Sequence, residues 1–379
     1  MTDYSNTGMR QYMLKSIIAV GLFFALISAA GELSYSIVGT GQNGASSGKY
    51  RENHDKTVTD LQTGLMWVKG RGKRVTYQEA ISGAAACRVG GYSDWRMPTI
   101  KELYSLILFS GVNGRPNQGG KGYVPFIDKN FFEFVYGNSS EGLRIIDSQD
   151  WSANENKATS GRLVFGVNFA DGRIKSYPKY KRRERKDNEL YVRYVRENSA
   201  YGINRFKANG EQTVSDLATG LMWSRSDSET GMDYPTAKKY VKKLNQQKYL
   251  GYQDWRVPTA KELQSIVDYT RSPDVTKSPA INSVFKTSSI LNEAGKKDYP
   301  YFWTSSQLNV DGRSPEQIYI AFGRALGFMR NQWVDIHGAG AQRSDPPTGD
   351  PTQFKNGRGP QGDAVRIQNY IRVVRTMSR

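Results

Sequence analysis

The stretch Asp94-Trp-Arg-Met-Pro-Thr-Ile-Lys-Glu-Leu103 recurs as Asp254-Trp-Arg-Val-Pro-Thr-Ala-Lys-Glu-Leu263, with eight of the ten positions identical. In each copy a threonine is followed three residues later by a glutamate, giving the pairs Thr99 and Glu102, and Thr259 and Glu262. This spacing predicts a capping box at the start of a helix. The proline before each threonine favours an extended incoming chain. We therefore predict an extended Asp-Trp-Arg arm that enters a capped helix, twice.

Other landmarks repeat in the same order around this stretch. Thr57 to Trp67 and Thr213 to Trp223 both carry Thr-Gly-Leu-Met-Trp, which predicts two short strands joined by a tight turn. A helix is predicted next, at 76–87 in the first copy and at about 235–247 in the second. Each copy ends in a strand-like run of apolar and basic residues, Tyr191 to Arg196 and Tyr370 to Arg375. These landmarks predict two tandem domains.

Length and composition fit this division and set the protein's surroundings. A chain of 379 residues is long enough for two domains with separate cores. We expect a signal peptide at 1–30, a lead-in at 31–50, domain one at 51–198, a linker at 199–212 and domain two at 213–379. Residues 338–364 are a Gly/Pro-rich insertion in domain two, interpreted as either a disordered loop or a variable face. The apolar run Ser16 to Ser28 is too short for a spanning helix.

The signal predicts an exported protein, at the cell surface, outside the cell or in the periplasm, that contacts the membrane only through this segment. A net charge of +17 favours an acidic partner. Polysaccharide and other envelope or host surface polymers fit this charge, whereas export argues against nucleic acid.

The ordered motifs resemble the Lcl C-terminal domain family, named after a collagen-like bacterial surface adhesin. The resemblance rests on Asp-x-x-Thr-Gly-Leu-Met-Trp, on Gly-Tyr-x-Asp-Trp-Arg-x-Pro-Thr-x-x-Glu-Leu and on the closing Val-Arg strand, present in both copies. The Arg-x-Pro-Thr-x-x-Glu element is also similar, more weakly, to the C-type-lectin and formylglycine-generating-enzyme group. This implies an α+β fold of two tandem C-type-lectin-like domains, each with two helices, short twisted antiparallel sheets and long loops.

Catalytic chemistry finds little support in the residue types. Cys87 is the single cysteine and aligns with Leu244, so we interpret it as a buried hydrophobic residue rather than half of a reactive pair. His54 and His337 are the two histidines, have no counterparts in the other copy, and are interpreted as surface or loop residues. We expect a protein that is not an enzyme and needs no cofactor.

Calcium stays an open alternative without a supporting motif. The lectin sequences that bind calcium have only faint echoes here, in Ser272-Pro-Asp274 and Trp333-Val-Asp335. Asp/Asn-rich loops nevertheless supply the oxygen ligands that calcium prefers.

The repeated residues are interpreted as structural. The capping boxes explain both glutamates, and Asp94 with Arg96, like Asp254 with Arg256, is interpreted as a buried charge pair or part of a ligand pocket. Core anchors are expected at the recurring tryptophans Trp67, Trp95, Trp151, Trp223, Trp255 and Trp303. Trp333 has no counterpart and is the candidate for exposed stacking on a ligand.

Basic clusters are the candidate ligand-binding face. The candidates are Lys179, Lys181, Arg182, Arg183, Arg185 and Lys186; Lys69, Arg71, Lys73 and Arg74; and Lys238, Lys239, Lys242 and Lys243. A solvated face is the plain alternative, but arginine and lysine also attract sulfated or carboxylated polymers. We therefore expect an adhesin or surface-recognition module for acidic glycans or other anionic polymers. The alternative is a structural or tip subunit of a surface filament or envelope complex, acting through protein contacts.

Overall fold

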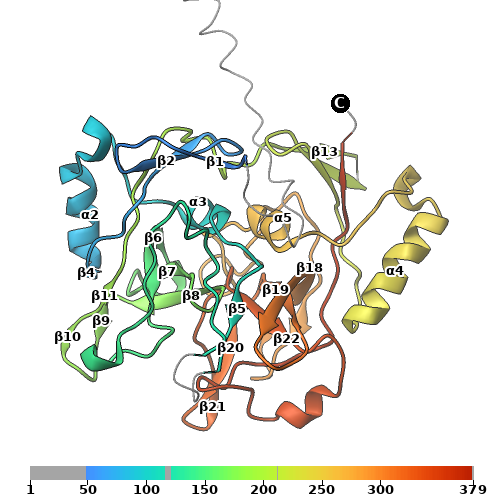
Figure 1. Cartoon of the computed structure of the whole chain (residues 1–379). Coiled ribbons are helices and arrows are strands. Elements are labelled where there is room, and N and C mark those ends of the chain that lie inside the picture. The colour runs from blue at the N-terminus through green and yellow to red at the C-terminus, as the bar shows by residue number, and fades with distance from the viewer. Residues whose placement is uncertain (1–47, 116–120, 211, 378–379) are drawn as a thin grey trace, which may run out of the picture.

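The computed structural model describes residues 48–115, 121–210 and 212–377, in which two copies of an α+β unit form one body (Figure 1). Each copy begins with a small antiparallel sheet that its own closing strand completes. In the first repeat the order is β1 (Tyr50–Glu52), β2 (Thr57–Asp60), β3 (Leu65–Val68) and β12 (Val195–Arg196). In the second it is β13 (Phe206–Asn209), β14 (Thr213–Asp216), β15 (Leu221–Ser224) and β23 (Val374–Thr376). The predicted Thr-Gly turns join β2 to β3 and β14 to β15.

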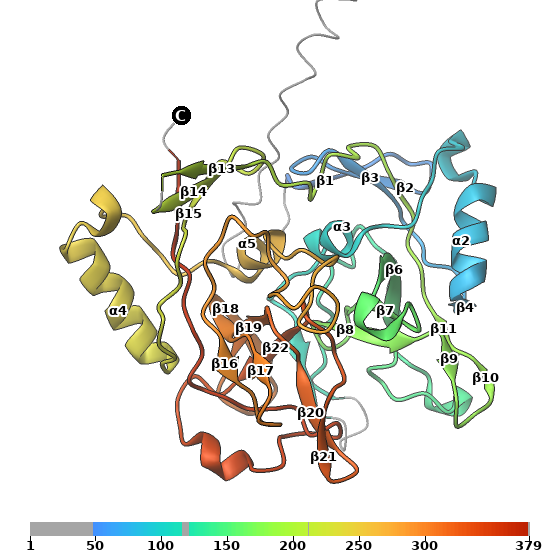
Figure 2. The ribbon, with the colours of Figure 1, turned by 180° about the vertical axis from the view of Figure 1, so that it is seen from behind.

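Two helices per repeat take equivalent places. The outer helices, α2 (Tyr77–Ala86) and α4 (Tyr234–Gln246), lie at opposite ends of the molecule, as both views show (Figures 1 and 2). The inner helices, α3 (Ile100–Ser105) and α5 (Ala260–Ser265), lie in contact at the centre. Outer helices therefore face solvent, whereas inner helices form the junction.

The predicted capping boxes are present at both inner helices, with each threonine side chain accepting from the glutamate amide and each glutamate accepting from the threonine amide. The expected charge pair within each arm is wrong. Arg96 instead binds Glu102 through two contacts of 2.7 and 2.5 Å, and Arg256 binds Glu262 at 2.6 and 2.7 Å.

The arm aspartates pair with the closing strands. Asp94 accepts from Arg196 at 2.7 Å, and Asp254 accepts from Arg375 at the same distance. Each arm is thereby tied to the end of its own repeat. The pairing differs from the expectation because each glutamate is already fixed one turn inside the helix, within reach of the arm's arginine.

A seven-stranded sheet runs through both repeats. Its order is β5 (Val112–Asn113), β18 (Tyr301–Val310), β19 (Glu316–Ala321), β22 (Gln342–Asp345), β8 (Arg173–Pro178), β7 (Leu163–Asn168) and β6 (Gln149–Glu155). The two repeats meet where β22 contacts β8, with Gln342 opposite Ile174, and β5 of the first repeat also pairs with β18 of the second. The insertion 338–364 thus supplies the strand that joins the repeats, and in this part it is no disordered loop.

Short hairpins and turns complete the chain. The hairpins pair β9 (Tyr180–Lys181) with β10 (Lys186–Asp187), β16 (Ile290–Leu291) with β17 (Lys297–Asp298), and β20 (Leu326–Met329) with β21 (Gln332–Asp335). A further two-stranded pair joins β4 (Val75–Thr76) to β11 (Glu189–Leu190), which is distant in sequence. The 3₁₀ turns are η2 (Val89–Gly91), η3 (Ser139–Glu141), η4 (Lys157–Thr159), η5 (Tyr249–Gly251) and η6 (Pro351–Phe354).

The largest hydrophobic cluster belongs to both repeats. It includes the inner-helix leucines Leu103 and Leu263, and it brings Phe165 of the first repeat edge-on to Tyr269 of the second at 4.8 Å. Two smaller clusters lie outward, one beneath α2 and one beneath α4. The six recurring tryptophans are all buried, as predicted. The expectation of two separate cores therefore fails at the junction, where a single core is shared.

Polar groups are also buried between the repeats. His337, expected at the surface or in a loop, lies in the loop after β21 but is only 1% exposed, and its Nε2 lies 2.7 Å from Asp363. Burial holds the pKa of His337 well below its usual range, and neighbouring Arg343 acts in the same direction. His54 is exposed, as expected, whereas Cys87 is only partly buried, at the end of α2. The burial of His337 was not predicted because its environment comes from segments that are distant in the sequence.

The predicted signal peptide and most of the lead-in lie outside the described residues. Within the described part of the chain, no helix has both the length and the apolar character that crossing a membrane requires.

Candidate functional site

The predicted basic face divides into separate patches on different parts of the molecule. The β9–β10 hairpin carries one patch and α4 carries another, at the far end (Figure 1). Free charge distinguishes these patches, because a cation already paired with a carboxylate contributes little to the binding of an acidic ligand.

The hairpin patch is partly neutralised. Lys179 donates to Glu155 at 2.5 Å, and Glu184 lies 3.5 Å from Lys181 and 3.0 Å from Lys186. Arg182, Arg183 and Arg185 are exposed. Three arginines at the tip of a small hairpin therefore remain available.

The cluster at residues 69–74 is not a common face. Arg71 is buried, donates to Asp150 at 3.0 Å and stacks on the ring of Tyr191, so it is a structural residue and not a surface cation. Lys69 pairs with Glu52 at 2.5 Å, and Arg74 donates to a backbone carbonyl. Lys73 is exposed. The expectation of a ligand-binding cluster fails for Arg71 because a partner 79 residues away in sequence buries it.

The patch on α4 has both free charge and shape. Lys238, Lys239, Lys242 and Lys243 are all exposed, and among the described residues no carboxylate lies within ion-pair distance of their ammonium groups. An open depression of about 530 Å³ lies between α4 and the Asp-Trp-Arg arm. Its lining residues are Lys238, Val241, Lys242, Asn245, Gln246, Gln253, Trp255, Arg256 and Val257. This volume lies within the range of ligand sites, and the lining contains no acidic residue.

The floor of this depression is fixed by hydrogen bonds. Asn245 of α4 donates to the carbonyl of Trp255 and accepts from its amide, both at 2.8 Å. The Trp255 indole donates to the carbonyl of Tyr249 at 2.7 Å, which holds the ring in place. Arg256 is 36% exposed although it binds Glu262. Lysine ammonium groups therefore stand at the rim of a rigid, amide-lined surface.

Sequence reasoning found the lysines but missed the amides. The rows Lys238/Lys242 and Lys239/Lys243 follow from their spacing on a helix. Asn245, Gln246 and Gln253 carried no distinguishing pattern, because only the packing of α4 on the arm brings them together.

The outer helix of the first repeat, α2, lacks the positive charge that α4 carries at the equivalent positions. By alignment of Ala80 with Ala237, the four lysines of α4 correspond to Ile81, Ser82, Ala85 and Ala86 of α2. These four residues are exposed and uncharged. The basic depression is accordingly a feature of the second repeat.

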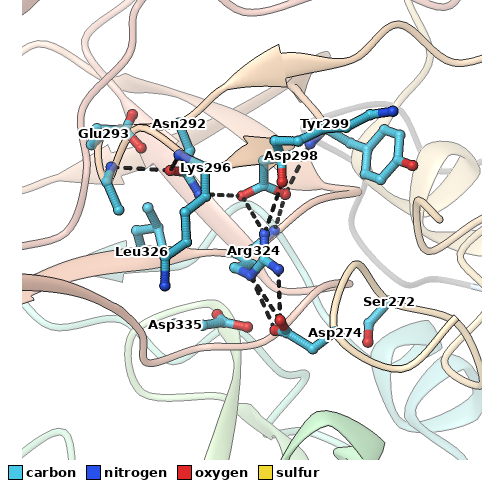
Figure 3. Close-up of polar contacts among 12 residues, drawn as sticks. Ser272, Asp274, Asn292, Glu293, Lys296, Asp298, Tyr299, Arg324, Leu326 and Asp335 are labelled. Carbon is cyan, nitrogen blue, oxygen red and sulfur yellow. Dashed lines mark hydrogen bonds and ion pairs between the residues drawn. The ribbon is translucent and has the colours of Figure 1, made fainter. Parts of the chain in front are cut away.

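The faint lectin-like sequences come together in space. Asp274 binds Arg324 through contacts of 2.6 to 3.2 Å, and Asp298 lies 3.5 Å from the same guanidinium (Figure 3). Asp335 lies on the same side of Arg324 as Asp274, and it accepts from the amides of Ala325 and Gly338. The carboxylates here surround an arginine, and the described residues include no group of three or more His, Cys, Asp or Glu arranged to hold a metal ion.

The fold and this surface define a tandem-repeat α+β protein with a basic depression on one repeat. The family model of the Lcl C-terminal domain matches residues 56–196 and again 212–335. Together the matches cover more than half of the chain, which belongs to the Lcl C-terminal domain family. The second match ends just before the insertion 338–364. Membership suggests a surface-associated, adhesin-like domain. No curated relative matches the chain.

Proposed function

We propose that this protein is an exported, non-enzymatic adhesin that binds acidic glycans or similar anionic polymers through the depression beside α4. The observation that carries the proposal is a set of four exposed lysines with no carboxylate partner in the part of the chain that the structure describes, two of which, Lys238 and Lys242, line an acid-free hollow. Sulfate and carboxylate groups along a polymer would meet several ammonium groups at once, and the side-chain amides of Gln246 and Gln253 would add directional hydrogen bonds. A C-type-lectin-like fold of each repeat belongs to the same proposal, supported by two helices and short antiparallel sheets per repeat.

The test compares dextran sulfate with neutral dextran, which differ only in charge. Binding of the protein to each would be measured by biolayer interferometry at 50 and 150 mM NaCl. The test variant replaces the α4 lysines by their α2 counterparts, K238I/K239S/K242A/K243A. The matched control, R182S/R183S/R185S/K186S, removes the same number of positive charges from the β9–β10 hairpin.

We expect the α4 variant to lose about tenfold or more in affinity for dextran sulfate, and the hairpin control to lose less than about threefold. Equal losses in both variants would mean attraction by net charge alone and would contradict a site beside α4. No binding of dextran sulfate by the wild type would contradict the proposal altogether. Purification from envelopes in a stoichiometric protein complex would then favour the filament or envelope-subunit alternative.

A further inference from the structure

A second hollow in the second repeat has a different chemistry. It is an open groove of about 700 Å³ between the β16–β17 hairpin, the β20–β21 hairpin and η6. The β20–β21 hairpin and η6, the short red helical turn, both lie along the lower edge of the molecule in the two views (Figures 1 and 2). The lining of the groove includes Glu293, Trp333, Phe354, Lys355, Arg366 and Tyr370.

One wall is a tryptophan held in a fixed position. Trp333 is partly exposed and pairs across the hairpin with Phe328, whose ring lies edge-on to the indole at 5.2 Å. Arg330 and Asn331 form the two-residue turn of this hairpin, both with positive φ, as a type I′ turn requires. A short, tightly turned hairpin thus presents an aromatic face beside solvent. The six recurring tryptophans are buried, so Trp333 differs from all of them.

The floor carries a planar pair of polar groups. Arg366 donates to both oxygens of Glu293, at 2.7 and 3.0 Å, and its guanidinium stacks 3.6 Å above the ring of Tyr301. The arginine side chain is 10% exposed, and its Nη1 has no hydrogen-bond partner among the described residues. Burial raises the pKa of Glu293, but the hydrogen bond from Arg366, the positive charge of Arg366 and a backbone hydrogen bond together outweigh it, so the pKa is lowered. The groove therefore offers a charged acceptor, Glu293, beside the small accessible part of the Arg366 side chain.

These features favour one kind of ligand. A pyranose ring has an apolar C–H face that covers an aromatic ring, and hydroxyls that donate and accept at once. A carboxylate beside a guanidinium satisfies two neighbouring hydroxyls in both senses. Glu293 offsets one of the two cations in the lining, Lys355 and Arg366, so charge attraction is weak here. We propose that this groove binds a pyranose unit of an oligosaccharide, stacked on Trp333 and hydrogen-bonded to Glu293 and Arg366.

Hydrogen bonds connect the insertion beside the groove to the start of α4, but the lining of the groove contains none of the four α4 lysines. Thr348 of the insertion donates to Asp233, the N-cap of α4, at 3.1 Å, and Tyr234 donates its amide to Pro347 at 2.9 Å. The groove borders the segment before α4 through Gly231, and its lining contains no residue of α4 itself. The inference goes beyond the proposed function, because it holds for an uncharged sugar as well as for an acidic one.

The experiment removes charge attraction and asks what binding is left. The full chain is titrated in 1 M NaCl, where the screening length is about 3 Å, with hexaoses of β-1,4-glucose, β-1,4-N-acetylglucosamine, β-1,4-xylose and α-1,4-glucose. Tryptophan fluorescence and saturation-transfer NMR report binding. The variants are W333A, W333F and E293Q, and K238I/K239S/K242A/K243A is the control. Thermal unfolding verifies that each variant is folded.

We expect at least one hexaose to bind in 1 M NaCl, with a loss of about tenfold or more in W333A, a smaller loss in W333F and no change in the α4 variant. Absence of hexaose binding, or equal binding by W333A, would overturn the inference. In that case binding of dextran sulfate at low salt would still support the site beside α4. Groove binding of peptides that depends on Trp333, without any saccharide binding, would likewise overturn it.

Discussion

The two repeats share a frame and differ in what they build on it. Both have the same capped inner helix, the same Arg-Glu pair and the same tie from the arm to the closing strand. Their outer helices occupy equivalent places, yet α2 is neutral where α4 carries four lysines. The motifs that both repeats share therefore maintain their common structure, whereas the surface features found in one repeat are the candidates for binding.

The central sheet shows a second difference. In the first repeat, β6, β7 and β8 follow one another in sequence and in space. In the second, β20 follows β19 in sequence but pairs with β21, and β22 from the insertion takes the place beside β19. This exchange frees the β20–β21 hairpin to carry Trp333 into the groove. It also places β22 where it joins the two repeats.

The largest expected effect comes from separating the repeats. Residues 48–200 and 201–377, expressed as separate chains, are each expected to lack a cooperative thermal transition. Each half exposes its part of the shared core, and every large apolar side chain uncovered costs about 1.5–3 kcal/mol, against a total stability of about 5–15 kcal/mol. Near-UV circular dichroism and calorimetry provide the measurement.

A full-length chain carrying a protease site near residue 199 is the control for this separation. After cleavage, the two fragments are expected to stay associated and to unfold in a single transition, because the shared sheet and core are intact. Two independent transitions near the temperature of the uncut protein, from the separate halves, would show that each repeat is a complete domain.

Equivalent substitutions in the two repeats test whether their Arg-Glu pairs contribute equally to stability. In E102Q and E262Q the glutamine can still complete the capping box, but the charge that binds Arg96 or Arg256 is lost. We expect each to cost about 1–3 kcal/mol, since the glutamate is buried while its arginine is half-exposed and stays hydrated.

Urea unfolding measures both variants, and the two costs should agree within about 0.5 kcal/mol, a usual margin for independent sites. Alanine at either position removes the cap as well and is expected to cost about 1 kcal/mol more. A clear difference between the losses of unfolding free energy in E102Q and E262Q would mean that the two Arg-Glu pairs contribute unequally to stability although their contacts match.

Local features of the fold were predictable from the sequence. A capping box lies within four residues, and a helix or tight turn is set by neighbours, so both inner helices and the Thr-Gly turns were found. The strand β22 was missed because its sequence, Gln342-Arg-Ser-Asp345, is polar, short and surrounded by glycine and proline. It is buried on both faces in the middle of the sheet, a position that only long-range pairing creates.

Charged residues show the same limit. Arg71 lies in a basic run that is typical of a solvated loop, yet Asp150 from β6 buries it. The lysines of α4 were found from helical spacing. They differ from the cations of the β9–β10 hairpin because no carboxylate among the described residues pairs with them, and because a hollow lies beside Lys238 and Lys242. Composition therefore identified cations, and only the structure separated paired from free charge.

The smallest expected effect concerns Asp335. This residue lies in the β20–β21 hairpin, which in the second repeat is separate from the central seven-stranded sheet. Burial raises the pKa of Asp335 to about 7, and the nearby carboxylates of Asp274 and Asp298 act in the same direction. The unfolded value is about 3.9. The folded protein therefore binds more protons than the unfolded chain between these values, and stability falls as pH rises toward 7.

Replacing Asp335 by asparagine keeps an oxygen that accepts from Ala325 and Gly338 but removes the charge. At pH 8.5, D335N is expected to melt about 2–4 °C above the wild type, and the difference should vanish near pH 5, where Asp335 is protonated in the folded state. The control D94N should behave in the opposite sense, because a hydrogen bond from Arg196 lowers the pKa of Asp94. Its loss of stability should be present at neutral pH and should fade in acid. A D335N effect that is unchanged between pH 5 and 8.5 would show that the carboxylate is ionised throughout, which would make the Arg324 cluster a balanced charge network instead of a source of pH dependence.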